Sequence, residues 1–178
     1  AMSFGGFVGI ALAARHGQLF NRLILVDTAA AFPEPAKAPL RVMAERALRD
    51  GMGAVVDTAL RRMFTERFIA ARPDILAACS ETLLRARPEH SATACRALAD
   101  LDLRPVLGRI ANPTVVIVGS LDVTTPPALA RETAAGIAGA RLVEIPDCAH
   151  CPPIEQPEEF ARVVGAFMAS GRSPGVRS

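Results

Sequence analysis

Three polar residues that together could activate a hydroxyl nucleophile lie far apart in the sequence. Ser3 stands in AMSFG, which is close to the G-x-S-x-G pattern of a serine on a sharp turn between a strand and a helix, although Ala1 replaces the first glycine. Asp122 ends the segment VIVGSLD, and His150 lies in PDCAHCPP. A serine attacks a carbonyl carbon when an imidazole takes its proton and a carboxylate orients the imidazole. The order Ser3, Asp122, His150 therefore predicts hydrolysis through an acyl-serine.

Each of these residues also has an ordinary structural explanation. A serine among small residues is often only a helix N-cap, and an aspartate after a strand often caps the next helix. Asp27, which ends LILVD, is the rival acid, but the Gly-x-x-Asp turn followed by two prolines favours Asp122. The other two histidines, His16 and His90, are predicted to be surface residues. Only the combination of serine, acid and base in this order, each after a separate strand, argues for catalysis.

Cys148 and Cys151 form a C-x-x-C pair, a spacing that permits a redox or metal site. A zinc site needs four ligands, and Cys79 and Cys95 lie in helical sequence without a second such pair. A thioredoxin-type pair opens a helix, whereas two prolines follow this one directly. We therefore expect no metal and no cofactor, and redox or metal chemistry at this pair is the weaker alternative.

Three short apolar runs are typical of strands buried on both faces of a parallel sheet: residues 23–26, 114–118 and 141–145. Helical spacing near residues 127–138 and 157–169 alternates with the last two runs, which predicts right-handed crossovers. The small and apolar residues after Ser3 predict a buried helix that Gly17 ends. The chain is therefore assigned to the α/β class, with helices flanking a parallel sheet.

Residues 34–107 differ in kind from the rest of the chain. Arginine- and alanine-rich segments with helical spacing are separated here by glycines and prolines, which predicts four or five short helices. About seventy residues between adjacent strands far exceed an ordinary connection, so this stretch is interpreted as a helical cap over the site. Residues 1–33 and 108–169 then form the α/β core. The polar segment 170–178 is predicted to be disordered or a linker.

The composition indicates one globular domain. The chain has 178 residues, 51% of them hydrophobic, which suffices for one substantial core. The net charge is +2, and the basic residues are scattered among acidic ones with few aromatic side chains, which disfavours nucleic acid as a partner. The sequence shows no signal peptide and no run that could span a bilayer, so we expect a cytoplasmic protein without a membrane partner. The oligomeric state is not indicated.

A resemblance to a known family is carried by five segments: SFGGFVGIALAARHG, RLILVDTAA, FTERFIAARPDI, DLDLRPVLGRIANPTVVIVGSLDVTTPP and IEQPEEF. They resemble the α/β-hydrolase superfamily and, more narrowly, the 3-oxoadipate enol-lactonases, which open a lactone ring in the β-ketoadipate pathway of aromatic catabolism. The resemblance implies an α/β-hydrolase fold with Ser3 as nucleophile, Asp122 as acid and His150 as base. It also implies that the backbone N–H of Phe4 is one of two donors to the oxyanion.

Two departures from the family leave the substrate open. Ala1 replaces the usual first glycine, and RRMFTERF has Met63 where lactonases often have a tryptophan facing the substrate. Methionine fills space but lacks the indole donor. The alternatives are a general carboxylesterase, a cofactor-free haloperoxidase-like hydrolase, and a fragment without catalytic activity. Arg61 and Arg62 adjoin Met63, but the sequence assigns no residue to substrate binding.

The resemblance covers only the C-terminal two thirds of the family's fold. We therefore expect the earlier strands, and the loop that supplies the second oxyanion donor, to be missing from this chain. The edge of the strand at residues 23–26 is then expected to have unpaired backbone groups, which is an aggregation hazard. The loss of one oxyanion donor alone would lower turnover by about a hundred- to a thousand-fold.

Overall fold

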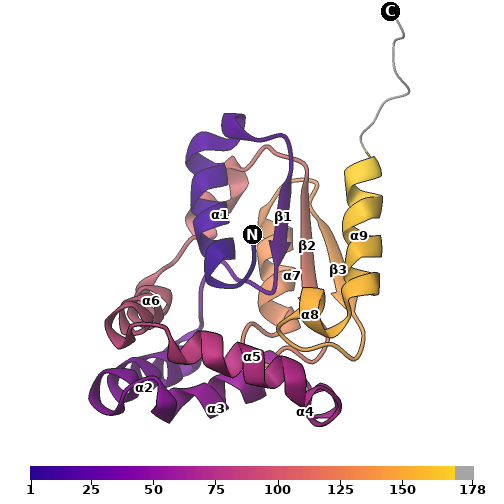
Figure 1. The fold of residues 1–178 in the computed structure, drawn as a ribbon. Helices are drawn as coiled ribbons and strands as arrows, with labels where there is room; N and C mark the ends of the chain where they lie inside the picture. The colour runs from indigo at the N-terminus through magenta and orange to yellow at the C-terminus, as the bar shows by residue number, and fades with distance from the viewer. Residues whose placement is uncertain (171–178) are drawn as a thin grey trace, which may run out of the picture.

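The computed structural model describes residues 1–170 and contains a parallel sheet with the strand order β1-β2-β3 (Figure 1). The strands are β1 (Leu23–Val26), β2 (Thr114–Gly119) and β3 (Arg141–Ile145). In this register Leu23 lies opposite Thr114, and Val115 lies opposite Arg141. Each run predicted to be a strand is one, with β2 longer by its last glycine, so the predicted α/β class is confirmed.

Helices cover both faces of the sheet (Figure 1). They are α1 (Phe4–His16), the 3-10 helix η2 (Arg104–Arg109), α7 (Pro127–Gly136) and α9 (Pro157–Ala169). Successive side chains of a strand point to opposite faces, so Val116 and Val118 pack in the core formed with α1 and α7, whereas Val115 and Ile117 pack against α9. Because all of β2 is buried, its sequence is a continuous apolar run rather than an alternating one.

The end of α1 differs from the prediction. The helix ends at His16 as expected, but Gly17 has φ −57° and leads into the 3-10 helix η1 (Gly17–Leu19), so it is not a left-handed capping glycine. Glycine is needed there for space, because a Cβ would lie 2.5 Å from Oδ1 of Asn112. The Nδ2 group of Asn112 donates to the carbonyl oxygens of Gly17 at 2.9 Å and Phe20 at 2.7 Å. This contact fixes the end of α1 beside the start of β2.

The outer edge of β1 is paired near its carboxyl end. The backbone N–H of Val26 donates to the carbonyl of Ala1 at 2.9 Å, and the N–H of Ser3 donates to the carbonyl of Val26 at 2.9 Å. Met2 forms a parallel bridge with Val26. The expectation of an unpaired edge is therefore wrong for these groups. The same pairing places Ser3 directly beside the end of β1.

A layer of helices follows β1 and precedes β2. It consists of α2 (Glu34–Asp50), α3 (Gly53–Met63), α4 (Glu66–Ala71), α5 (Pro73–Leu84) and α6 (Pro88–Asp100). In Figure 1 this layer lies across the ends to which the strand arrows point. The carboxyl ends of parallel strands are where catalytic groups gather in open α/β sheets, so the layer faces the predicted site.

The segment 171–178 lies outside the described residues, and with it all but Ser170 of the tail predicted to be disordered. Within residues 1–170 we find no helix of the length and apolar character needed to cross a membrane.

Candidate active site

Ser3 occupies a strained turn between the edge of β1 and the first residue of α1. Its φ of 49° lies in the left-handed region, which a non-glycine residue adopts only when its surroundings hold it there. The carbonyl of Ser3 accepts hydrogen bonds from the Thr28 hydroxyl at 3.0 Å and from the Gly6 N–H at 2.8 Å. A Cβ on Gly6 would lie 2.4 to 2.6 Å from the Thr28 side chain, so only glycine lets the helix start approach this closely. The turn holds the Ser3 side chain at the carboxyl end of β1.

Ala1, in place of the first glycine of the pattern, is accommodated by a glycine elsewhere. The Cβ of Ala1 lies 2.9 Å from where a Cβ of Gly9 would be. Any side chain at position 9 would therefore collide with Ala1. The departure from the G-x-S-x-G pattern leaves the serine turn intact because the neighbouring helix has a glycine at the point of contact.

Asp122 lies in the turn after β2, where four hydrogen-bond donors surround its carboxylate. Oδ1 accepts the backbone N–H groups of Thr124 at 2.7 Å and Thr125 at 3.0 Å. Oδ2 accepts the Thr125 hydroxyl at 2.7 Å and lies 2.8 Å from Nδ1 of His150. Burial opposes ionisation of Asp122, but the hydrogen bonds from His150 and Thr125 outweigh it and lower the pKa of the carboxyl below its ordinary value. The side chain is therefore a buried, fully hydrogen-bonded carboxylate.

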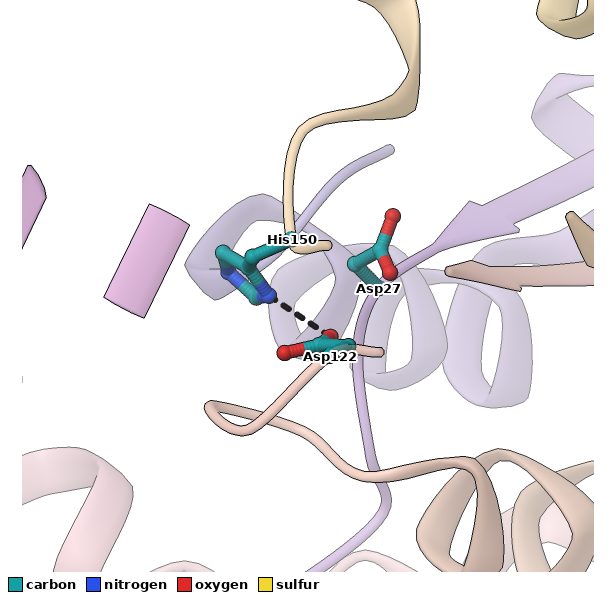
Figure 2. A group of neighbouring side chains, drawn as sticks. All are labelled: Asp27, Asp122 and His150. Carbon is teal, nitrogen blue, oxygen red and sulfur yellow. Dashed lines mark hydrogen bonds and ion pairs between the residues drawn. The ribbon is translucent and has the colours of Figure 1, made fainter. Parts of the chain in front are cut away.

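His150 lies in the loop after β3 and bridges the other two residues. Its Nε2 atom is 2.8 Å from the Ser3 hydroxyl. Its Nδ1 atom faces the carboxylate of Asp122, and Figure 2 shows this second contact. With Asp122 ionised, the proton belongs on Nδ1, which leaves the lone pair of Nε2 free to accept the Ser3 proton. The His150 side chain is only 5% exposed, so water competes little for either contact.

Gly119, at the end of β2, allows the loop that contains His150 to approach the turn that contains Asp122. A Cβ on Gly119 would lie 2.0 Å from the carbonyl oxygen of Ala149 and 2.4 Å from that of Cys148. The Leu121 N–H donates to the Cys148 carbonyl at 2.9 Å. No side chain larger than hydrogen fits at position 119, and this close approach is what brings His150 within hydrogen-bond distance of Asp122.

Asp27, the rival acid, lies beside Asp122 but makes no hydrogen bond with the histidine among the described residues (Figure 2). Its Oδ1 accepts the N–H of Gly119 at 2.9 Å, and its Oδ2 is buried without a partner in the part of the chain described. Burial is the main reason that the pKa of Asp27 is raised to about 9, and the nearby charges of Asp122 and Glu155 add to it. Asp27 is thus a neutral acid at pH 7, whereas Asp122 is the ionised partner of His150.

A cavity of about 250 Å³ opens onto Ser3 and His150. Its lining is mainly apolar and comes from the serine turn, the helices of the layer and the histidine loop: Met2, Ser3, Leu40, Met43, Ala59, Arg62, Met63, Cys95, Leu98, Thr124, His150 and Cys151. Met63 is among them, at the position discussed for the family's tryptophan. Arg62 is the only arginine, lysine or carboxylate residue in this lining. It takes part in none of the ion pairs found among residues 1–170. The cavity therefore combines an apolar surface with one unpaired cation.

The cysteine pair has the environment of core residues. Cys148 and Cys151 are both buried and form no disulfide. Burial raises the pKa of the Cys148 thiol far above its ordinary value and that of Cys151 to about 12. Thiolates are the reactive and metal-binding form of cysteine, so this environment disfavours redox or metal chemistry at the pair.

Other residues singled out in the sequence lie as follows. His16 and His90 are exposed, as predicted. Phe4 is the first residue of α1, and its backbone N–H has no backbone acceptor among residues 1–170. This leaves the N–H available beside the Ser3 hydroxyl.

The sequence analysis did not identify Thr125 and Glu155. Thr125 could have been suspected, because it lies three residues after Asp122 and its hydroxyl donates to that carboxylate. Glu155 could not, because it contacts a residue 90 positions away in the sequence.

Comparison with known proteins shows the family to which the chain belongs. Residues 1–163 match the model of the alpha/beta hydrolase family. The chain is 34% identical to 3-oxoadipate enol-lactonase 2 of Acinetobacter baylyi, over 94% of this chain and 61% of that protein. It is 31% identical to a pimeloyl-[acyl-carrier protein] methyl ester esterase of Aromatoleum aromaticum, over 91% of this chain and 70% of that protein. The crystal structure of the enol-lactonase from Burkholderia xenovorans superposes with a TM-score of 0.87 at 37% identity, covering 94% of this chain and 63% of that one. The chain thus spans about three fifths of the length of these lactonases.

Proposed function

The chain belongs to the alpha/beta hydrolase family, and from this premise we propose that it is a serine hydrolase with Ser3 as nucleophile, His150 as base and Asp122 as acid. The observation that carries the proposal is the continuous pair of 2.8 Å contacts from the Ser3 hydroxyl through the imidazole to the Asp122 carboxylate. His150 is 147 positions from Ser3 and 28 positions from Asp122 in the sequence, yet its side chain contacts both. This is the arrangement of nucleophile, base and acid that nucleophilic catalysis needs.

The proposed reaction consumes one water and forms an acyl-serine intermediate. His150 Nε2 takes the Ser3 proton while Oγ bonds to the carbonyl carbon, and the carboxylate of Asp122 stabilises the imidazolium. The backbone N–H of Phe4 donates to the developing oxyanion. The imidazolium then gives its proton to the leaving oxygen, the carbon–oxygen bond breaks, and water activated by His150 hydrolyses the acyl-serine. The leaving group of an enol-lactone is an enol, which rearranges to a ketone.

Among possible substrates we propose the enol-lactone of 3-oxoadipate. The support comes from the 34% identical relative that carries this name and from Arg62 in the cavity. A six-carbon dicarboxylate with one carboxyl closed into a lactone keeps the other as a free carboxylate. Arg62 lines the cavity and has no carboxylate partner among the ion pairs of residues 1–170. Burial raises the pKa of the Cys95 thiol in the same lining, and the charge of Arg62 opposes this shift. A guanidinium binds a carboxylate by two parallel hydrogen bonds.

A neutral ester is the second candidate, because one relative at 31% identity is named as a methyl ester esterase. The apolar lining of the cavity would accept an acyl chain, and this reaction uses the same three residues. A neutral ester, however, has no carboxylate with which Arg62 could form an ion pair. The two candidates therefore predict different consequences when the charge of Arg62 is removed.

Steady-state kinetics of the wild type and of Arg62→Met on the enol-lactone and on a neutral aryl ester test this choice. For a lactonase we expect the wild type to prefer the lactone and the variant to raise KM for it by about ten- to a hundred-fold, since a lost charge-assisted hydrogen bond has that effect. Aryl ester turnover should change by less than about two-fold. Preference for aryl esters by the wild type, or an equal loss on both substrates, would contradict the lactonase assignment while leaving the serine hydrolase assignment open.

A further inference from the structure

Glu155 joins the helical layer to the loop that carries His150. It is the last residue of the short helix α8 (Pro152–Glu155) and follows His150 closely in sequence. One carboxylate oxygen, Oε2, accepts the backbone N–H of Ala149 at 3.0 Å. The other, Oε1, accepts the N–H of Thr65 at 3.3 Å and also the Thr65 hydroxyl. A single carboxylate thus ties the residue before the base to a residue in another layer of the fold.

Thr65 lies in the corner between α3 and α4, and this corner contacts the catalytic loops at further points. The carbonyl of Met63 accepts the backbone N–H of His150 at 3.1 Å. The carbonyl of Arg62 accepts the hydroxyl of Thr124 at 3.2 Å, in the turn that holds the acid. The corner at residues 62–65 therefore contacts the loop of the base and the turn of the acid at the same time.

The two contacts to the base loop act on consecutive peptide groups. The N–H of Ala149 is held through Glu155, and the N–H of His150 is held directly by Met63. Fixing two successive peptide planes fixes the direction in which the His150 side chain leaves the backbone. The imidazole must reach Ser3 and Asp122 together, so a small rotation of this loop would lengthen at least one of its 2.8 Å contacts.

The corner also contributes to the cavity. The side chains of Arg62 and Met63 line it, while their carbonyl oxygens bind the catalytic loops. A substrate that contacts the side chains of Arg62 and Met63 therefore contacts the two residues whose carbonyl groups bind the loop of His150 and the turn of Asp122.

We propose that Glu155 is a positioning residue that, together with Thr65, couples the α3–α4 corner to the alignment of His150, so that the helical layer sets the efficiency of the base. The inference rests on the proposed serine hydrolase function. Neither residue lines the cavity, so Glu155 and Thr65 act through the backbone of the histidine loop rather than on the substrate.

The test uses Thr65→Val, which removes the hydroxyl that donates to Glu155, and Thr65→Ser, which retains it. Glu155→Gln removes one of the carboxylate acceptors, and Glu158→Gln, an exposed glutamate in the first turn of α9, is the matched control. Steady-state kinetics on the enol-lactone and on an aryl ester are measured for each variant and for the double variant Thr65→Val with Glu155→Gln. Amide hydrogen exchange of Ala149 and His150 reports on the loop without any need for activity.

We expect Thr65→Val and Glu155→Gln each to lower kcat by about tenfold with KM little changed, because the misaligned base affects the chemical step. The double variant should lose no more than the larger single loss, since both changes break the same contact. The amides of Ala149 and His150 should exchange faster in these variants, and Thr65→Ser and Glu158→Gln should match the wild type in every measurement.

Thr65 also caps α4 by accepting the N–H of Phe68 at 3.2 Å, so its valine variant could lose stability for that reason alone. Loss of the cap would lower the melting temperature without changing kcat, and its effect would add to that of Glu155→Gln. Either result, or unchanged exchange of the two amides, would overturn the inference. A wild type that hydrolyses neither the enol-lactone nor an aryl ester would instead refute the proposed function, and exchange would still show whether the loop is held by the corner.

Discussion

Replacement of Asp27 by asparagine should remove a strong pH dependence of stability. Asp27 is fully buried, with Oδ1 bonded to the Gly119 N–H and Oδ2 without a partner in the described chain. Burial raises its pKa from 3.8 to about 9, against the opposing effect of the Gly119 hydrogen bond. The native side chain is therefore a neutral acid at pH 7. The amide of asparagine is neutral, has nearly the same shape and can still accept the Gly119 hydrogen bond.

The magnitude follows from the difference between the two pKa values. Between 3.8 and about 9 the folded chain keeps a proton on Asp27 that the unfolded chain releases. The protonated Asp27 side chain stabilises the folded state fully below the pKa of the unfolded chain. This stabilisation is lost as the pH rises from that pKa to the pKa of the folded chain, by about 1.4 kcal/mol per pH unit. From about pH 5 to about pH 8, the free energy of unfolding of the wild type should fall by about 4 kcal/mol relative to that of Asp27→Asn.

Urea unfolding followed by circular dichroism at several pH values measures this difference. Asp57→Asn is the matched control, because it makes the same change of side chain at an exposed position on α3. Curves for wild type and Asp27→Asn that run parallel from pH 5 to pH 8 would refute the reasoning, since they would mean that Asp27 releases its proton in the folded state as readily as in the unfolded one.

Further substitutions test the packing and the electrostatics of the site. Gly119→Ala should abolish hydrolysis and destabilise the fold, because its Cβ would lie 2.0 Å from the Ala149 carbonyl, whereas Gly165→Ala in α9, with no atom within 4 Å, should raise the free energy of unfolding by about 1 kcal/mol. Equal melting temperatures for the two variants would contradict this. Asp122→Asn should lower kcat by about 10⁴-fold at unchanged KM, because an amide in place of the carboxylate favours the wrong imidazole tautomer. A loss below tenfold in stopped-flow or steady-state assays would show that another group orients His150.

Much of the site could be predicted because its residues follow strands that the sequence marks clearly. The runs that became β1, β2 and β3 are apolar because both faces of the sheet are covered, and this pattern is local. Ser3 follows Met2, which pairs with the end of β1, and Asp122 and His150 lie in the loops after β2 and β3, so the topology of the sheet brings all three to one edge. The preference for Asp122 over Asp27 followed from the shape of the turn after the second strand. In the structure the Nδ1 atom of His150 lies within hydrogen-bond distance of Asp122.

The remaining features depend on contacts between distant segments, which no local pattern encodes. Gly17 has the sequence of a helix stop, but its role is to make room for Asn112, almost a hundred positions away. Nothing in the local sequence distinguishes Arg62 from the solvated arginines nearby, because only the folded structure places it in the lining of the cavity. The local sequence around Glu155 predicts only a short helix. Its contact with Thr65 could not be predicted, because it depends on how the helical layer packs against the loop of His150.

Covalent labelling of the 178-residue chain with a fluorophosphonate, followed by mass spectrometry of the peptides, tests the central claim most directly. A hydroxyl activated by His150 and Asp122 should give one adduct per chain, on Ser3, and labelling should be lost in Ser3→Ala and slowed at least about a hundred-fold in His150→Ala. A folded wild-type chain that remains unlabelled, or a Ser3→Ala variant that is labelled as fast as the wild type, would contradict the account.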